Sequence, residues 1–489
     1  MSRNYKKAIT KVQAAIIVIV LIIAIIVGVY AYFTILVPPK VEMKVAAWGS
    51  FAVAMKDLAS KFMEKYPGIK IEVVTYDWDT MREKLFYDIS VKGGEFEIYF
   101  WDCIWTGTFA PHVYTWDELK SKYPDAEILT KSDYDDLIPT IDSQYAFWEG
   151  KRIGVVYAAN VMPLFYRKDL IESTSVKENY KKWVSAHMSE LTALVAKFGL
   201  REEIPKEMKV PETLTDFLVI GRYFTKSINP DSPVYYGVAI VGKRTHVIFW
   251  QYLPFFAVWR TTSEGIKKFG EVTMPWGHYF TADGKPAFDP SLGDEGIQAL
   301  EYYKEITKYA PSPYEADYPE ALEAFGKGKA ALLPLWASAG IELIDQAEKY
   351  HPEVAGKVAA TKHPGGLGCD GTWQIGVSKY AKHPREAWMF IQFCTFADSQ
   401  KLSWEIGQVF PSRASVIKAL APKYPYMSAL YEQLLHPAVR TYIPPEPELD
   451  DALVKWVSEF FVGRIDARTA LENTVKDWNE ILARTGWKK

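Results

Sequence analysis

The chain has 489 residues, 49% of them hydrophobic, and a formal net charge of −3. This length predicts more than one domain, and the charge excludes the basic surface that nucleic-acid binding requires. The three cysteines, Cys103, Cys369 and Cys394, lack the spacing of a zinc site or a disulfide framework, so we expect no metal and no cofactor. Scarce asparagine beside abundant lysine, glutamate and tyrosine is typical of proteins from thermophiles.

The first forty residues predict a membrane anchor. Residues 12–37 carry no charged side chain, and they follow a basic stretch that includes Lys6, Lys7 and Lys11. A helix of about 20 apolar residues crosses the hydrocarbon layer of a membrane. Because a basic flank stays in the cytoplasm, we expect 1–40 to be a cytoplasmic flank with a single-pass transmembrane helix, and the remainder to be extracellular.

Two interpretations of this anchor stay open. One is a permanent single-span helix. In the other, residues 6–10 resemble a class III, prepilin-like signal of archaeal surface proteins, which would be cleaved after Ala8 and leave the apolar helix on the mature chain. Both interpretations keep the protein on the cell membrane.

Residues 41–101 alternate between strand and helix patterns. Strands are predicted at 45–47, 69–73 and 96–101, with helices at 55–62 and 81–91. Strands joined by helices form a mostly parallel sheet, and ligands bind beyond the carboxyl ends of such strands. Trp48, Ser50, Trp101 and Asp102 stand at these ends, so we expect them in a binding site.

The rest of the chain continues the alternation around a charged, helical insertion at 171–207. One apolar strand is predicted at 155–166, and others are predicted at 236–241, 330–336 and 373–377. Helices are predicted at 213–225, 294–309, 318–325, 384–396 and 449–487.

No enzyme signature stands out. The sequence lacks the nucleophile elbow, the His-Glu-x-x-His helix and the Walker loop, so we expect a protein that is not an enzyme. Residues 326–329 lack the serine or threonine of a phosphate loop and predict a turn. Paired glycosidase carboxylates have no sequence signature, so a surface polysaccharide hydrolase stays open as an alternative.

Tryptophans at the ends of predicted elements give the strongest functional signal. A sugar ring presents an apolar face, which suits an indole, and a rim of hydroxyls, which suits polar side chains. Any one of these tryptophans could be a core residue, but five from separate elements favour a sugar site. The predicted ligand-binding residues are Trp48, Ser50, Trp101, Asp102, Trp105, Asn160, Trp336 and Trp373.

From about residue 45 to its C-terminus the sequence resembles the extracellular solute-binding proteins of ABC importers, the sugar-binding family that includes maltose-binding protein. Short segments in the family's order carry the resemblance, and their order over nearly the whole ectodomain is specific. They lie at 45–49, 66–71, 93–98, 154–160, 166–170, 325–331, 371–373, 386–391 and 407–413.

The resemblance implies a fold and a function. The fold would be the α/β periplasmic-binding-protein-like type II, with a hinge between lobe one (41–157 plus 374–408) and lobe two (158–373 plus 409–489). The chain would pass between lobes near 157–160, 371–373 and 408–411. A sugar or oligosaccharide would be captured by lobe closure and delivered to the membrane subunits of an ABC importer. A pilin-like structural surface subunit stays open as an alternative.

Overall fold

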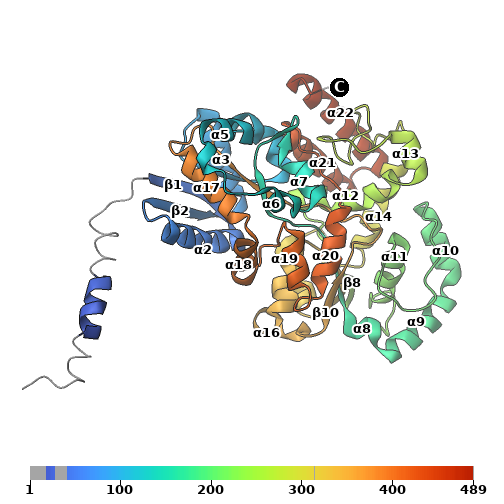
Figure 1. Ribbon diagram of the computed structural model, residues 1–489. Helices are drawn as coiled ribbons and strands as arrows, with labels where there is room; N and C mark the ends of the chain where they lie inside the picture. Colours follow the sequence, from blue (N-terminus) through green and yellow to red (C-terminus); the bar gives the residue numbers. More distant parts are fainter. Residues whose placement is uncertain (1–17, 28–40, 313, 488–489) are drawn as a thin grey trace, which may run out of the picture.

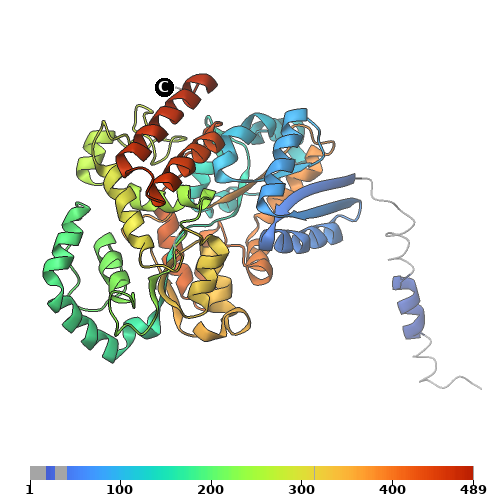
Figure 2. The ribbon, with the colours of Figure 1, turned by 180° about the vertical axis from the view of Figure 1, so that it is seen from behind.

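The computed structural model describes residues 18–27, 41–312 and 314–487, apart from the side chain of Ser50. The longer strands form two separate sheets, and each sheet is covered by helices (Figure 1, Figure 2). The buried apolar side chains likewise divide into two clusters, one around each sheet. The chain therefore folds into two α/β lobes, which confirms the predicted fold class.

The first lobe contains a sheet with the strand order β2-β1-β3-β11-β6. Strands β1 (Val41–Trp48), β2 (Ile69–Tyr76) and β3 (Ile98–Asp102) are parallel because the helices α2 (Gly49–Lys65) and α3 (Trp78–Val91) return the chain between them. The parallel pattern ends at β11 (Trp373–Val377), which runs antiparallel to both β3 and β6 (Val155–Ala158). Strand β11 enters from the other lobe, so it crosses the sheet in the opposite direction.

Short helices and one hairpin complete the first lobe. The hairpin pairs β4 (Phe147–Trp148) with β5 (Lys151–Arg152). The helices are η2 (Cys103–Trp105), α4 (Thr106–Phe109), η3 (Ala110–His112), α5 (Trp116–Lys122), η4 (Pro124–Ala126), α6 (Lys131–Asp135), α7 (Pro139–Tyr145), α17 (Pro384–Cys394), α18 (Ala397–Gly407), α19 (Ala414–Leu420) and α20 (Tyr426–Leu435).

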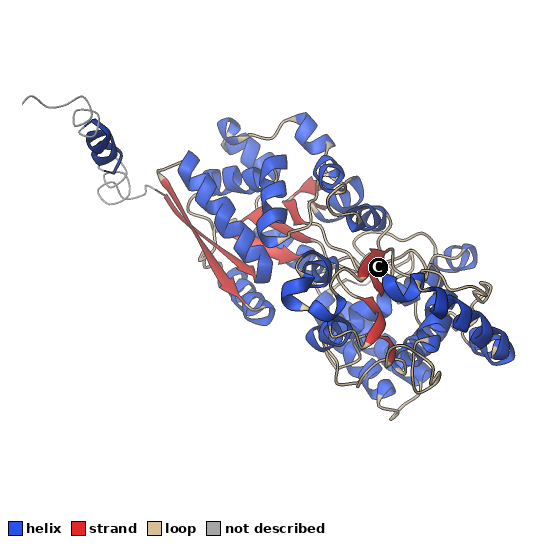
Figure 3. Ribbon diagram, turned by 90° about the horizontal axis from the view of Figure 1, so that it is seen from below, coloured by secondary structure: helices blue, strands red, loops and turns tan. Residues whose placement is uncertain are grey.

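The second lobe contains a sheet with the order β10-β7-β9-β8. Its strands are β7 (Leu164–Arg167), β8 (Tyr236–Val238), β9 (Ala330–Pro334) and β10 (Val358–Thr361). Figure 3 shows both groups of strands flanked by helices. The helices of this lobe are α8 (Lys168–Glu172), α9 (Thr174–Ala186), α10 (Met188–Lys197), α11 (Leu214–Tyr223), α12 (His246–Arg260), α13 (Ser263–Phe269), α14 (Glu295–Thr307), α15 (Tyr318–Gly326), η5 (Ala337–Ala339), η6 (Ile341–Asp345), α16 (Ala347–Tyr350), η7 (Pro352–Val354), α21 (Glu446–Phe461) and α22 (Ala467–Thr485).

The apolar stretch 155–166, predicted as one strand, is two strands in different sheets. Strand β6 belongs to the first lobe and β7 to the second, so the chain passes between the lobes at 159–163. The side chain of Asn160 accepts a hydrogen bond from the Val161 amide within this passage. Both strands are buried on both faces, and hydrophobic pattern alone does not mark the break between two such strands.

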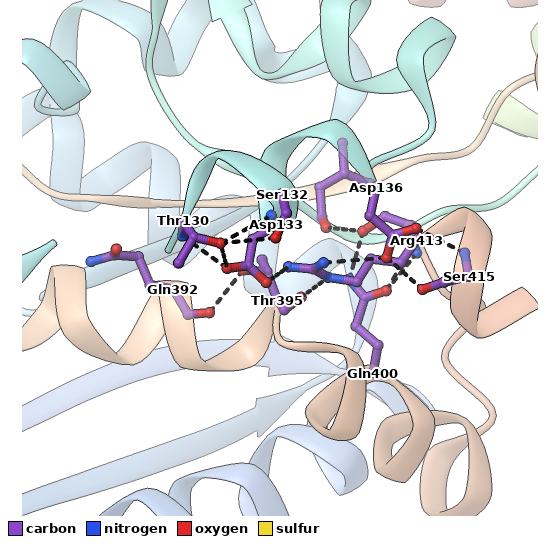
Figure 4. Close-up of polar contacts among 11 residues, drawn as sticks. Thr130, Ser132, Asp133, Asp136, Gln392, Thr395, Gln400, Arg413 and Ser415 are labelled. Atoms are coloured by element: carbon purple, nitrogen blue, oxygen red, sulfur yellow. Dashed lines mark hydrogen bonds and ion pairs between the residues drawn. The ribbon is translucent and has the colours of Figure 1, made fainter. Parts of the chain in front are cut away.

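The last passage lies later in the chain than the predicted position at 408–411. The buried side chains of α19 and α20 belong to the cluster of the first lobe. Arg413, which precedes α19, is 3% exposed and forms ion pairs with Asp133 (3.1 Å) and Asp136 (3.3 Å) (Figure 4). The passage instead follows α20, where Val439 packs in the first cluster and Ile443 in the second.

The predicted anchor lies mostly outside the described residues. Residues 18–27 are helical, and their apolar side chains are more than half exposed. Ala8 and the remainder of 12–37 belong to the part of the chain that the structure does not describe. Among the described residues, no helix combines the length and the apolar character that crossing a membrane requires.

Candidate ligand-binding site between the lobes

Indole rings gather at one edge of the first sheet. Trp48 ends β1, Trp78 follows β2, and Trp105 lies in η2 directly after β3. Trp373 begins β11, but this strand is antiparallel, so Trp373 pairs with Asp102 at the same edge. The ring centroids of Trp48 and Trp373, of Trp373 and Trp105, and of Trp105 and Trp78 are 5.6, 5.9 and 5.2 Å apart. The strand-end rule thus brings these rings into one continuous row.

Aromatic rings of the second lobe continue this row. His246 and Trp250 lie one turn apart on α12, and therefore on the same face of the helix. The ring centroid of Trp78 lies 5.5 Å from that of His246 and 6.1 Å from that of Trp250. Trp336, which follows β9, is 5.3 Å from Trp250. The row therefore joins the lobes, and we call it the inter-lobe aromatic row.

A buried ion pair lies beside this row. Arg440, in the passage between α20 and α21, donates from Nη2 to Asp102 Oδ1 at 2.5 Å. The side chains of Arg440 and Asp102 are 1% and 5% exposed. The Arg440 guanidinium also lies 5.2 Å from the centroid of the Trp250 ring. Asp102, a strand-end residue of the first lobe, is therefore held by a residue that sequence analysis did not identify.

Two further carboxylates come from the first turns of α21. Glu446 and Asp450 are one turn apart, and both are buried. Asp450 Oδ2 lies 2.6 Å from His246 Nδ1. Burial lowers the pKa of His246, but the hydrogen bond and charge of Asp450 outweigh that effect and raise it. Burial and the nearby Asp450 raise the pKa of Glu446 well above its usual range.

Several buried polar atoms around the row have no hydrogen-bond partner among the described residues. They include indole donors, carboxylate and hydroxyl acceptors, and a guanidinium donor. These atoms are Trp48 Nε1, Trp250 Nε1, Asp370 Oδ2, Thr372 Oγ1, Arg440 Nε, Asp450 Oδ1 and both carboxylate oxygens of Glu446. Buried polar groups in folded proteins are nearly always paired, so such a concentration is typical of a site that a polar ligand completes.

Trp336 and Asn160 meet at Gly371. A Cβ atom on Gly371 would lie 2.4 Å from Trp336 Nε1 and 3.6 Å from Asn160 Nδ2. Glycine therefore lets the indole of Trp336 approach the backbone of the passage between β10 and β11. Trp336 and Asn160 thus both lie near the second-lobe end of the row.

Two predicted residues stand apart from this arrangement. Trp101 is fully buried in the core of the first lobe, where it donates to Thr106 and stacks on Phe109. Its neighbour Asp102 faces Arg440, and successive strand residues point to opposite faces, so Trp101 points away from the row. Ser50 lies in the first turn of α2, and its side chain is outside the described part of the structure.

The structure adds residues that sequence analysis missed. Trp78 begins α3, two residues after the end of β2, whereas the predicted strand ended at residue 73 and so did not mark it. His246 and Trp250 share one helix face, but α12 is apolar along most of its length, so the spacing alone does not single them out. No local sequence pattern marks Arg440 or Glu446 as a site residue, because their place beside the row depends on the path of the chain after α20 and on the position of α21. Across the described residues, no cluster of three or more histidine, cysteine or acidic side chains suits a metal ion.

Two α/β lobes with aromatic and charged side chains between them are the architecture of two-lobed ligand-binding proteins. Residues 57–429 match the model of the bacterial extracellular solute-binding protein family. This match spans more than half of the chain, and the protein belongs to this family.

Curated relatives and solved structures agree with this assignment. A mannitol-binding protein of Pseudomonas aeruginosa is 23% identical over 360 residues, which are 71% of this chain and 66% of that protein. A probable ABC transporter-binding protein of Deinococcus radiodurans is 21% identical over 359 residues, which are 72% of this chain and 71% of that protein. Maltose-bound MalE3 of T. maritima has the same fold, with a TM-score of 0.68 and 18% identity over 90% of this chain and all of that one.

Proposed function

We propose that this protein is a surface-anchored receptor that binds a sugar or oligosaccharide between its lobes and delivers it to the membrane subunits of an ABC importer. The inter-lobe aromatic row, bordered by unpaired polar atoms, carries this proposal. The relatives support the ligand class, since one is named for mannitol and one structure holds maltose. Family membership favours a receptor over a surface hydrolase or a pilin-like subunit.

The indole faces would stack on sugar rings, and the polar groups would bind hydroxyls. We assign the stacking contacts to Trp48, Trp105, Trp336 and Trp373 from the predicted set, with Trp78 and Trp250 added by the structure. Asp102, which lies beside the row, and Asn160, which lies near its second-lobe end, would bind hydroxyls. Aromatic stacking and hydrogen bonds together fix both the position and the orientation of a ring.

We expect the lobes to move apart when a ligand enters, because aromatic rings of the two lobes contact each other at the candidate site. The Trp78 ring contacts His246 and Trp250 directly, so a ligand that enters here replaces contacts between rings. A ligand that bridges both walls binds the closed arrangement better than the open one, and this difference shifts the population toward closure. Residues 12–37 would hold the receptor beside its importer.

Calorimetric titration of the full-length protein, in detergent, against a panel of polyols, monosaccharides and maltooligosaccharides tests this function. We expect at least one sugar to bind, and Trp78→Ala or Trp250→Ala to weaken it about tenfold or more, because each removes a stacking face. Both tryptophans are only partly buried, so the variants are expected to fold.

Trp456→Ala is the matched control, since Trp456 is also partly buried but bonds to Asp477 on α22, away from the row. Absence of binding across the panel, or equal weakening by the control, would contradict the proposal.

A further inference from the structure

The inter-lobe site holds more buried carboxylates than buried guanidinium groups. Asp102, Asp370, Glu446 and Asp450 are each no more than 4% exposed, and Arg440, at 1%, lies among them. An ionised carboxylate in a dry interior is costly unless a cation or several hydrogen bonds compensate it. The chemistry of a suitable ligand therefore depends on which of these carboxylates already have a cation or a hydrogen-bond donor.

Arg440 and His246 contact only some of these carboxylates. Arg440 pairs with Asp102, and His246 contacts one oxygen of Asp450. One oxygen of Asp370 accepts from the Thr372 amide. Both oxygens of Glu446 and the second oxygen of Asp450 have no partner among the described residues. Glu446 and Asp450 thus form an incompletely compensated acid pair on one face of α21.

Charged groups on every neighbouring element act on this pair. Asp102 and Arg440 approach from the first lobe and from the last passage, Arg82 from α3, and His246 from α12. Burial, the largest effect, and the acidic neighbours raise the pKa of Glu446, and they outweigh Arg440 and Arg82, which favour its ionised form. Burial and the neighbouring acids therefore make ionisation of both carboxyl groups at once unfavourable until a cation reaches them.

Building on the sugar-receptor function proposed above, we propose that the ligand carries a protonated amine, as an amino sugar does, and that this amine binds between Glu446 and Asp450. A hydroxyl donates one hydrogen bond and leaves the carboxylate charge in place. An ammonium group donates up to three hydrogen bonds and also cancels the charge.

The aromatic walls favour the same ligand. The faces of indole rings attract cations, and tryptophan does so best among the aromatic side chains. The Arg440 guanidinium already lies over the Trp250 ring, and the Arg82 guanidinium lies 5.9 Å from the centroid of the Trp78 ring. A ring that stacks on this row while its amine reaches the acid pair satisfies both kinds of group at once.

Matched sugars test this inference with the full-length protein. Glucosamine, galactosamine and glucosamine oligomers are each titrated beside the neutral and the N-acetylated forms of the same sugar. We expect the amine form to bind about tenfold tighter than its neutral form. We also expect binding to release protons, measured as heats that differ between buffers with different ionisation enthalpies.

The outcomes separate this inference from the proposed function. If neutral or N-acetylated sugars bind as tightly as the amine forms, or tighter, the amine inference is overturned and the sugar receptor stands. If no sugar of either panel binds, both proposals fall.

Glu446→Gln supplies the decisive variant, because it keeps the shape of the side chain and removes its charge. We expect the ratio of the affinity for the amine form to that for the neutral form to fall from about tenfold to about one. Asp450→Asn is a second test, in case the first variant fails to fold. Glu448→Gln, which changes an exposed acid on the same helix that pairs with Arg484, is the control and should keep the preference. An amine preference that survives Glu446→Gln and Asp450→Asn overturns the inference.

Discussion

Arg440 shows how one residue connects the two lobes. Its guanidinium bonds to Asp102 at the end of β3, contacts the sulfur of Cys103 at 2.8 Å and lies over the Trp250 ring of α12. A buried guanidinium of this kind is stable only while its carboxylate partner is present. The ion pair therefore holds Asp102 in place beside the aromatic row, and it holds the chain segment at Arg440 against the first lobe.

Breaking this pair tests its role. We expect Arg440→Met to destabilise the protein by about 3 kcal/mol or more, because Asp102 is left buried without its cation. The double variant Asp102→Asn with Arg440→Met should recover part of that loss, since both charges are then gone. Thermal unfolding followed by circular dichroism measures both effects.

Lys70→Met is the control for the ion pair. Lys70 and Glu42 also form a pair, but their side chains are 58% and 65% exposed, so its loss should cost about 1 kcal/mol or less. A similar loss of stability in Lys70→Met and Arg440→Met would show that the buried pair has no special role.

At the scale of elements, helix spacing and strand ends create the site. His246 and Trp250 on α12, and Glu446 and Asp450 on α21, share faces because four residues make about one helical turn. Polar contacts add to the apolar packing of α19. Arg413 is a polar anchor: it joins α19 to Asp133 and Asp136 near α6 and to the Thr395 carbonyl after α17 (Figure 4).

Removing this anchor is expected to loosen α19. Arg413→Met leaves Asp133 and Asp136 without their cation and should cost about 2 kcal/mol. Hydrogen exchange followed by mass spectrometry should show faster exchange across 414–420 and unchanged exchange in α22. Arg468→Met removes an exposed pair with Asp294 and serves as the control. Unchanged exchange in α19 would contradict the role of Arg413 as an anchor.

At the scale of the whole molecule, contacts away from the aromatic row also join the lobes. Tyr426 of α20, which packs in the first cluster, donates to Asp345 at the end of η6 in the second lobe. Burial raises the pKa of Asp345 from 3.8 to about 6, although the Tyr426 hydrogen bond acts in the opposite direction. The stability of the folded protein is therefore expected to depend on pH through Asp345.

The sign of this pH dependence follows from the raised pKa. The folded protein binds the Asp345 proton more tightly than the unfolded chain does, so this stabilisation is complete below pH 3.8 and is lost as the pH rises through about 6. Asp345→Asn stays neutral at every pH. We expect its melting temperature, relative to that of the unmodified protein, to rise between pH 4 and 7 by an amount equivalent to about 1 kcal/mol, because the site is partly exposed. A constant difference across this range would contradict the prediction.

The sequence alone determined the α/β class, the family and most elements of the first lobe. The alternation of 69–73 and the helical spacing of 55–62 are local patterns, and they correspond to β2 and α2. Element ends also pointed to Trp48, Trp105 and Trp373. Trp48 and Trp105 lie at or just after the carboxyl ends of parallel strands, and Trp373 begins an antiparallel strand at the same edge.

Only the tertiary structure decided which lobe α19 and α20 join, which way Trp101 points, and that Arg440, Glu446 and Asp450 lie beside the indoles. Residues 155–166 read as one strand because burial on both faces hides the change of sheet. A local pattern of apolar residues shows which side of a segment is buried, but it does not show which distant segment covers that side. The partners across the lobes are separated by hundreds of residues, as Asp102 and Arg440 are, and they meet only through the path of the whole chain.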